Sequence, residues 1–585
     1  FAEVHYNMGL AFRVLGKLED SVDCFQHATA LNPDYIEAYN NLGVTFQDLG
    51  RVEEAIASCK KAIELSPEHF GAHSNLGNAL QQIGNVRDAV ICYQKAITIN
   101  PDNAEAHANL GVIRHENGLL DEAIVHYRTA LAIAPDNADI HMNIGSALSD
   151  LGSIEEGISH YRKALEIKPG FVDAHSNLLL TEQYRPNQSL ETLYKLHCEW
   201  GECHGRTFVK TWPSHMNNRS PDRILRVGFV SPKLGRHPVG FFVVGMFENW
   251  SEDKIQKHVY SDHPGDDLTE RIKSATDVWH NVRGISDEDL AKRILDDQID
   301  ILVDLSGHSA QNRLLMFARK PSPLQVSWGD YSATTGLSAI DYLICDKYSV
   351  RKDEEKYFTE KIILMPDGWL CYDPPTHAPK VGPLPFERNG HITFGSFSNP
   401  VKLNDSVISV WSRILAEVPN SKLIIKYKGI NANSNIERLS GAFEANGIDR
   451  SRLVLEGKSP HIQLLERYND VDIALDPFPY SGGLTTLEAL WMGVPVITLP
   501  GKTFASRLSL SHLSNIGISE FVARDQDDFV KLAIILAEDT EKLKDLRAKL
   551  RQTMANSTVC DSKKFAEGFA GLMREIWQNW CFQIS

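Results

Sequence analysis

The sequence lacks the features typical of a membrane-spanning protein, of a nucleic-acid-binding protein and of a protein with a structural metal site. No apolar run reaches the roughly 18 residues needed to cross a bilayer. Positive charge is in short supply: 60 Lys and Arg stand against 76 Asp and Glu, and the net charge of −16 argues against nucleic acid as a partner. The nine cysteines include no CxxC pair, which predicts a reduced, cytosolic chain without structural zinc. We therefore expect a cytoplasmic protein, or a nucleocytoplasmic one in a eukaryote.

What the sequence does contain is a period of 34 residues through its first third. Prolines and glycines recur at this interval, which is typical of tetratricopeptide repeats with two antiparallel helices each. Asparagines keep the same interval: Asn7, Asn41, Asn75, Asn109, Asn143 and Asn177. Because stacked repeats align equivalent positions, we expect these amides to form a ladder along one surface. An amide both donates and accepts hydrogen bonds, so the ladder is predicted to bind the backbone of an extended peptide.

The residues of each repeat also predict how its two helices pack against each other. The glycine two residues after the asparagine lets two helices approach closely, and a large side chain such as Phe25, Tyr93 or Tyr127 fills the groove between them. A histidine column could suggest a metal, but we interpret it as a set of packing residues: His5, His73, His107, His141 and His175.

After residue 222 the pattern changes from helix pairs to short buried strands alternating with helices. Leu225–Val230 and Ile299–Asp304 are strands of this kind, and Ile392–Phe394 begins a second run. Such alternation predicts parallel sheets with crossover helices. The expected fold is an α-solenoid followed by α/β, with two Rossmann-like units. The predicted domains are repeats at 1–182, a helical linker at 183–222, Rossmann-like units at 223–385 and 386–560, and a closing helix at 561–585.

A glycine-containing turn follows the strand that ends at Asp476. The turn contains Gly482 and Gly483, and a helix begins near Thr485. Amides at a helix N-terminus bind anions, and Ser481, Thr485 and Thr486 would add hydroxyl donors to a phosphate. The alternative is an ordinary capped turn between a strand and a helix.

Two further turns follow strands in the same way. Asn399 and Lys402 come after Ile392–Phe394, and a lysine there can neutralise a departing diphosphate without metal. His237 follows the first strand of the other unit and could accept a proton or hydrogen-bond a sugar. The alternatives are a solvated lysine and a structural histidine.

Taken together, the asparagine ladder, the two units and three further stretches resemble the O-linked N-acetylglucosamine transferase family, in the bacterial or plant-like form without a long insert. The stretches are 317–326, 328–336 and 499–507. The resemblance implies an inverting, metal-independent glycosyltransferase of the two-Rossmann B type that needs no cofactor. Its donor would be a nucleotide sugar, UDP-GlcNAc by preference, and its acceptors Ser or Thr in extended segments of proteins. A homodimer formed through the repeats is a further expectation.

The same resemblance implies roles for individual residues. Lys402 matches the lysine that stabilises the diphosphate, Asn399 stands where a glutamine contacts it, and Thr485 matches a phosphate-binding threonine. Leu484 and Gly483 depart from the family's threonine and histidine, and Thr486 is expected to compensate. His237 matches a histidine assigned either as base or as positioning residue.

For the nucleoside, the resemblance points to three residues. Glu488 stands where an aspartate holds the ribose, His461 replaces a lysine that contacts uracil, and Arg467 matches an arginine of that pocket.

Two other functions fit the sequence. The short spacer and Leu370-Cys371-Tyr372 resemble the plant branch that transfers fucose from a GDP-sugar, whereas Thr503–Arg507 resembles the N-acetylglucosamine type. Fucose or glucose is therefore the alternative sugar. A non-catalytic repeat scaffold is the alternative of a different class.

Overall fold

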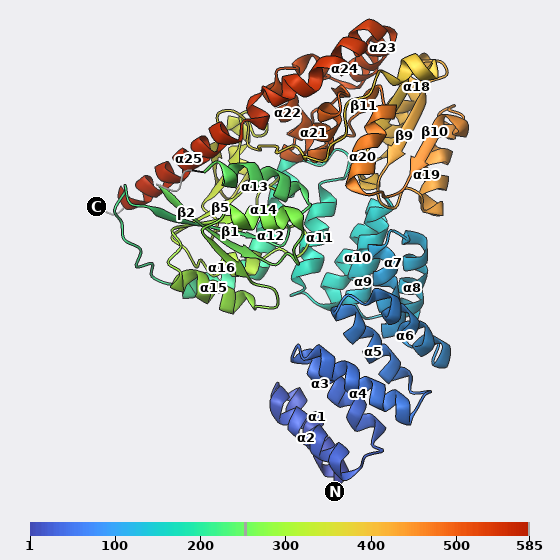
Figure 1. Cartoon of the computed structure of the whole chain (residues 1–585), viewed down its shortest axis with the longest axis vertical. Helices are drawn as coiled ribbons and strands as arrows, with labels where there is room; N and C mark the ends of the chain where they lie inside the picture. The colour runs from blue at the N-terminus through green and yellow to red at the C-terminus, as the bar shows by residue number, and fades with distance from the viewer. Residues whose placement is uncertain (251–253, 583–585) are drawn as a thin grey trace. The chain divides into compact units, whose positions relative to one another are not determined.

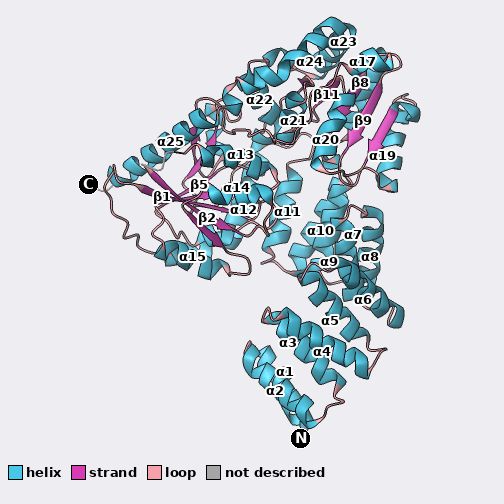
Figure 2. Ribbon diagram, in the orientation of Figure 1, coloured by secondary structure: helices cyan, strands magenta, loops and turns pink. Residues whose placement is uncertain are grey.

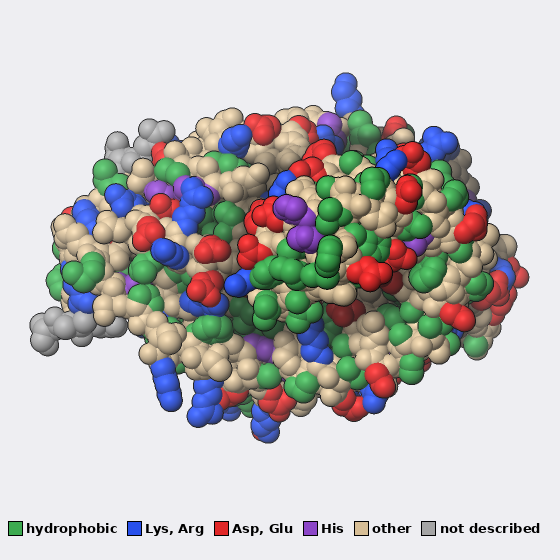
Figure 3. All heavy atoms as spheres, turned by 90° about the horizontal axis from the view of Figure 1, so that it is seen from below, with side chains coloured by type: hydrophobic (Ala, Val, Ile, Leu, Met, Phe, Trp, Pro, Cys, Tyr) green, Lys and Arg blue, Asp and Glu red, His purple; other side chains and the backbone are tan. Residues whose placement is uncertain are grey.

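The computed structural model describes residues 1–250 and 254–582, which form two compact units (Figure 1). The first unit spans Phe1–Leu148 and the second begins at Ser149. Residues 251–253 of the predicted 223–385 unit and 583–585 of the predicted closing helix lie outside the described residues. No helix among those described is both long enough and apolar enough to span a membrane. Acidic and basic side chains are mixed over the face drawn in Figure 3.

The first unit consists of helix pairs at the predicted 34-residue interval (Figure 2). Its helices are α1 (Ala2–Val14), α2 (Leu18–Leu31), α3 (Ile36–Asp48), α4 (Val52–Leu65), α5 (Phe70–Gln82), α6 (Val86–Ile99), α7 (Ala104–Glu116), α8 (Leu120–Ile133) and most of α9 (Ala138–Asp150). A methyl group added at Gly77 would lie 2.6 Å from the Tyr93 ring, which confirms the predicted close approach. A second glycine column, which the sequence analysis did not single out, has positive φ at the turn inside each repeat: Gly16, Gly50, Gly84, Gly118 and Gly152.

The asparagines of the ladder are partly engaged within the repeats. Asn41 Nδ2 donates to the Tyr6 hydroxyl at 3.0 Å and to the Glu37 carbonyl oxygen at 2.9 Å. In the next two repeats, Asn75 Nδ2 donates to Asn40 Oδ1, and Asn109 Nδ2 donates to Asn78 Oδ1, both at 2.8 Å. Neighbouring repeats are thus cross-linked by these amides, and at Asn41 only the side-chain oxygen remains for a ligand.

The second unit begins with further helices, and the first two of them continue the repeats. They are α10 (Ile154–Ile167), α11 (Val172–Glu182) and α12 (Leu190–Trp200), followed by π-helical and 3-10 turns at 201–211. Ser176 Oγ lies 3.2 Å from His308 Nδ1, and Leu179 shares a buried cluster with Leu302 of the first sheet. The boundary between the compact units therefore falls before α10, whereas the repeat pattern itself runs to residue 182.

Two parallel sheets follow, which confirms the predicted fold class (Figure 2). The first has the order β3-β2-β1-β4-β5-β6-β7, with strands β1 (Leu225–Ser231), β2 (Ile255–Ser261), β3 (Val278–Asn281), β4 (Ile301–Asp304), β5 (Leu324–Ser327), β6 (Tyr342–Cys345) and β7 (Lys361–Leu364). The second has the order β10-β9-β8-β11-β12, with β8 (Thr393–Ser396), β9 (Lys422–Lys426), β10 (Leu453–Glu456), β11 (Ile473–Leu475) and β12 (Val496–Ile497). The central strands β4, β5, β8 and β11 are buried on both faces, as parallel sheets covered by helices require, whereas the edge strands β3, β7 and β10 are partly exposed.

Helices connect and cover both sheets. Around the first lie α13 (Pro238–Glu248), α14 (Asp267–Ser274), α15 (Asp287–Asp296) and α16 (Leu314–Ala318). Around the second lie α17 (Pro385–Asn389), α18 (Asp405–Glu417), α19 (Asn433–Ala445), α20 (His461–Arg467), α21 (Leu484–Trp491), α22 (Leu508–Ile516), α23 (Gln526–Glu538) and α24 (Thr540–Ala555). The last helix, α25 (Ser562–Phe582), returns to the first sheet, where the Phe569 ring lies 4.9 Å from that of Trp328.

Candidate functional site

Strand order reverses at one point in each sheet, and His237, Lys402 and the 476–483 turn lie beside these two points. In the first sheet the reversal separates β1 from β4, and in the second it separates β8 from β11. Loops at the carboxyl ends of strands diverge at such a point and leave room for a ligand. His237 follows β1, Lys402 follows β8, and the 476–483 turn follows β11.

Lys402 lies directly beside the glycine turn. It ends a 3-10 turn, Pro400–Lys402, that Asn399 caps by accepting the Val401 amide at 3.2 Å. Lys402 Nζ donates to the Ser481 carbonyl oxygen at 2.9 Å and lies 4.4 Å from the centre of the Tyr480 ring. Burial lowers the pKa of this lysine to about 8, although the Asp476 carboxylate acts to raise it. The group therefore remains a cation at neutral pH, with protons left for an anionic ligand.

The 476–483 turn is held by its own polar groups. Asp476 Oδ1 accepts the Gly482 amide and its Oδ2 accepts the Thr498 hydroxyl, both at 2.6 Å. A Cβ at Gly482 would lie 2.4 Å from Thr486 Oγ1, so only glycine fits there. Gly483 begins α21 without any side-chain cap, so the first amides of that helix face no competing side-chain acceptor.

The hydroxyls of the turn differ from the prediction. Ser481 is fully buried; its Oγ donates to the Ala505 carbonyl oxygen at 3.1 Å and accepts the Leu508 amide at 3.0 Å. Thr486 Oγ1 pairs with Ser509 Oγ at 2.8 Å. These two hydroxyls therefore brace the turn in this structure and do not point to a ligand, because a segment some 25 residues downstream supplies their partners. Of the three hydroxyls expected to bind phosphate, only that of Thr485 lies on a partly exposed residue.

The residues predicted to hold the nucleoside lie together along α20 and α21. His461 Nε2 lies 2.7 Å from Glu488 Oε1, and His377 Nε2 lies 3.1 Å from His461 Nδ1. Arg467 is engaged by two carboxylates, with contacts of 2.7 Å to Glu456 and 2.6 Å to Asp470. Sequence reasoning missed His377 because it follows the Pro374-Pro375 break, where no strand or helix marks it.

His237 occupies the N-cap of α13, where its Nδ1 accepts the Val239 amide at 3.3 Å. Burial lowers its pKa to about 4, although Asp330 acts in the opposite direction. The ring is therefore neutral at pH 7. Because Nδ1 acts as the acceptor, the proton of the neutral ring lies on Nε2, which is then a hydrogen-bond donor.

Asp330 and two tyrosines complete the region, and none of them was assigned a role from the sequence. Asp330 Oδ2 lies 2.6 Å from Lys233 Nζ; burial acts to raise the pKa of Asp330, but Lys233 and His237 outweigh burial and lower it. Burial and, to a lesser extent, the Asp330 charge raise the pKa of Tyr480. The Tyr184 ring, just after α11, stacks on that of Tyr480 at 4.7 Å.

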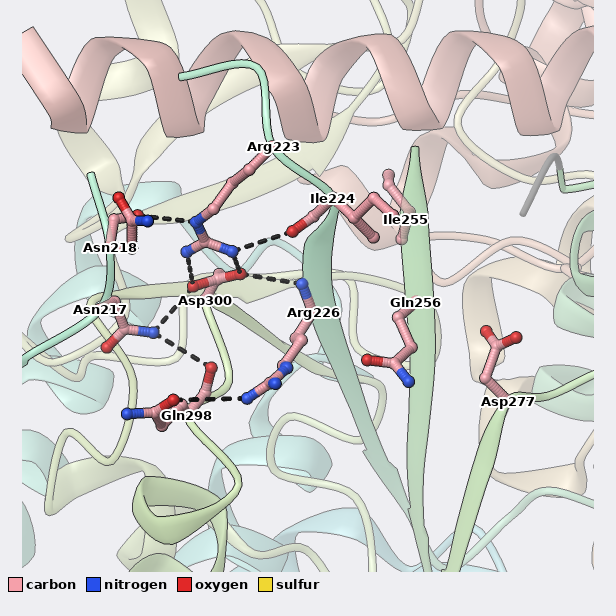
Figure 4. A pocket seen from close by; sticks show the side chains of 10 residues that line it. All are labelled: Asn217, Asn218, Arg223, Ile224, Arg226, Ile255, Gln256, Asp277, Gln298 and Asp300. Carbon is pink, nitrogen blue, oxygen red and sulfur yellow. Dashed lines mark hydrogen bonds and ion pairs between the residues drawn. The ribbon is translucent and has the colours of Figure 1, made fainter. Parts of the chain in front are cut away.

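A separate cavity of about 690 Å³ opens at the amino ends of β1 and β2 (Figure 4). Figure 4 shows Arg223 and Asn217 pointing at Asp300, which Arg223 binds through both guanidinium ends. The charges lining this cavity largely satisfy one another. It lies at the opposite ends of the strands from Lys402 and His237, and we do not assign it to the same site.

Comparison with known proteins agrees with this arrangement. The profile of glycosyl transferase family 41 matches residues 204–379 and 385–569. The chain belongs to this family. Tetratricopeptide-repeat profiles match residues 9–50, 36–69, 74–138 and 138–171.

Three relatives show how far the similarity of this family 41 member extends. A probable UDP-N-acetylglucosamine–peptide N-acetylglucosaminyltransferase SPINDLY from Petunia hybrida is 36% identical over 414 residues, which are 69% of this chain and 44% of that protein. Its counterpart from Hordeum vulgare is 37% identical over 414 residues, 69% of this chain and 43% of that one. The chain thus spans less than half the length of these curated relatives. A solved structure of a mutant Thermobaculum terrenum O-GlcNAc transferase is 33% identical, covers 88% of this chain and 98% of its own, and has a TM-score of 0.84.

Proposed function

We propose that the protein is an inverting glycosyltransferase that transfers N-acetylglucosamine from UDP-GlcNAc to Ser or Thr hydroxyls of proteins. One observation carries the proposal. The Lys402 ammonium group lies against the Ser481 carbonyl oxygen at 2.9 Å, beside the uncapped N-terminus of α21 at the strand-order reversal of the second sheet. Membership of family 41 and the names of the relatives support the same activity.

In the proposed reaction, the acceptor hydroxyl attacks the anomeric carbon as the bond to the diphosphate breaks, and the hydroxyl proton is lost to water. Negative charge then develops on the leaving phosphate oxygens. Lys402 and the first amides of α21 are fixed before the reaction begins, so they stabilise this charge without reorganising. These residues supply the stabilisation with neither a cofactor nor a metal in the proposed scheme.

His237 has a positioning role in this scheme. Its neutral ring presents an Nε2 donor, since Nδ1 accepts the Val239 amide. A donor can hold a sugar or phosphate oxygen, but it cannot accept the hydroxyl proton until the tautomer changes. We therefore place His237 as a hydrogen-bond donor to the substrate and not as the base.

For the donor, Glu488 is the proposed partner of the ribose hydroxyls, and His461 the proposed partner of the base. The 2.7 Å contact between them supports a joint role, because a nucleoside presents its base and ribose a few ångströms apart. Acceptor proteins are proposed to bind the Asn ladder through the side-chain oxygens that the repeats leave available.

A donor-hydrolysis screen tests the proposal. The full chain would be incubated with UDP-GlcNAc, UDP-glucose and GDP-fucose, and release of nucleoside diphosphate measured. We expect hydrolysis of UDP-GlcNAc and its loss in Lys402→Ala. Release from GDP-fucose alone would replace the sugar with fucose, which the sequence Leu370-Cys371-Tyr372 favours. Release from none, with peptide binding intact, would identify a scaffold.

A further inference from the structure

Three side chains able to bind a metal ion lie together at the edge of the first sheet. His258 is on β2, His280 is on the edge strand β3, and Asp297 directly follows α15. One ligand atom from each lies within 4.8 Å of the other two. None of the three has a role in the proposed glycosyl transfer.

His258 is buried without a partner. Its exposure is 6%, and neither ring nitrogen makes a hydrogen bond to any residue that the structure describes. A buried polar group left unpaired destabilises the folded state. Such groups in folded proteins usually have an ion or a water molecule as the missing partner.

The side chains of His280 and Asp297 are already separated by the distance expected between two ligands of one metal ion. His280 Nε2 lies 3.4 Å from Asp297 Oδ2 without hydrogen-bond geometry. Two ligands at about 2.0–2.1 Å from a tetrahedral zinc ion are separated by roughly 3.3–3.4 Å. The pair therefore needs little adjustment to share one ion.

Tyr260 supports the arrangement from the next position on the same face of β2. Its hydroxyl donates to Asp297 Oδ2 at 2.7 Å, and its ring stacks on His280 at 4.7 Å with an angle of 13° between the rings. Outer partners of this kind fix the orientation of metal ligands.

Burial favours the neutral form of both imidazoles. Burial lowers the pKa of His258 and of His280; Asp297 opposes this shift at both rings, whereas Arg293 adds to it at His280. Arg226 adds to it at His258, and Asp277 opposes it there. Neutral imidazole is the form that binds a metal ion.

We propose that His258, His280 and Asp297 bind one zinc ion, which ties the edge strand β3 to β2 and to the end of α15. Two imidazoles and one carboxylate suit zinc, with a fourth position left for water. Gln256 and Gln298, which line the cavity of Figure 4, are close in sequence to His258 and Asp297. The prediction of no structural zinc rested on the cysteines, which lack metal-ligand spacing, whereas these three side chains come together only in the fold.

The test uses the full chain, stripped with a chelator and desalted. His175, Cys203 and His204 form a second group of potential ligands, so every protein would carry Cys203→Ser. Zinc binding would be measured by calorimetry and Co²⁺ binding by absorption. We expect one site per chain, cobalt d–d bands without a thiolate charge-transfer band, and a higher unfolding midpoint with zinc.

Single substitutions test which side chains bind the zinc ion. His280→Gln and Asp297→Asn should each weaken zinc binding at least about tenfold, the lower end of what even an outer-shell change costs a metal site. Asp296→Asn removes a neighbouring exposed carboxylate and should leave binding unchanged. Should His258→Gln fail to fold, the two more exposed ligands still decide the question. Absence of zinc binding, or equal binding by His280→Gln and the parent, would overturn the proposal and leave water as the partner of His258.

Discussion

The repeat unit and the two-sheet unit differ in whether a key contact recurs at equivalent positions or occurs at one residue. The repeats use the same helix-to-helix contact at equivalent positions. At Gly9, Gly77 and Gly111, an added Cβ atom would lie less than 3 Å from an aromatic ring. In the two-sheet unit, the candidate site instead depends on a single side chain, Lys402, beside the uncapped N-terminus of α21. Function spread over equivalent positions should tolerate single losses, whereas function concentrated in one residue should not.

The largest effect that this comparison predicts is that of Lys402→Ala. Removing the one preorganised cation should lower turnover by about 10²-fold or more, because the leaving diphosphate loses its counter-charge. Donor hydrolysis by the variant, with folding checked by circular dichroism, measures the effect. Lys422→Ala removes an exposed lysine at the start of β9 and is the control. Unchanged hydrolysis in Lys402→Ala would contradict the role of Lys402 in catalysis.

The glycines offer a matched pair, one from each unit. A Cβ at Gly77 would meet Tyr93 at 2.6 Å, and one at Gly482 would meet Thr486 Oγ1 at 2.4 Å. Overpacking of this kind costs about 1–3 kcal/mol. Gly77→Ala should lower the stability of the repeats and spare donor hydrolysis, whereas Gly482→Ala should reduce hydrolysis.

Thermal unfolding and donor hydrolysis, measured on both variants, separate the two outcomes. Gly441→Ala, which meets open space, is the control. A loss of hydrolysis in Gly77→Ala equal to that in Gly482→Ala would show that the two units do not divide their tasks in this way.

The pH dependence of the reaction should follow Lys402. Its ordinary pKa of 10.5 is lowered to about 8 by burial, so the free enzyme loses this charge as pH rises through 8. We expect kcat/KM to fall about tenfold per pH unit above that value. Over pH 8–10.5 the unfolded chain binds more protons at this group than the folded one, so its contribution to stability increases with pH.

The activity loss should therefore precede any unfolding. Donor hydrolysis and a thermal unfolding midpoint, recorded in the same buffers, test this order. A flat kcat/KM profile from pH 7 to 10 would exclude Lys402 as the titrating group.

The smallest effect belongs to a single rung of the ladder. Asn109→Ala removes one amide of several, and one hydrogen bond contributes about 0.5–1.5 kcal/mol. Transfer to a peptide with Ser or Thr in an extended segment should weaken by that amount, while donor hydrolysis stays constant. Asn117→Ala, an asparagine of the same repeat outside the ladder, is the control. Equal loss of transfer and hydrolysis would make the ladder a purely structural element.

The sequence by itself determined the parts of the protein that depend on local spacing. A 34-residue period predicts helix pairs, and apolar runs such as Leu225–Val230 and Lys422–Lys426 predict parallel strands, because periodicity decides which faces are buried. The order of strands and turns in the sequence also predicted that Lys402, His237 and the 476–483 turn lie at the carboxyl ends of strands.

Only the tertiary structure decided which polar group meets which. Ser481 and Thr486 have their hydroxyls bound by the 505–509 segment, His461 meets both Glu488 and His377, and Tyr184 stacks on Tyr480. His258, His280 and Asp297 come together from two strands and a helix end. The physical reason is that a hydrogen bond or a metal site requires atoms within a few ångströms, and segments far apart in the chain reach that distance only once both sheets have formed.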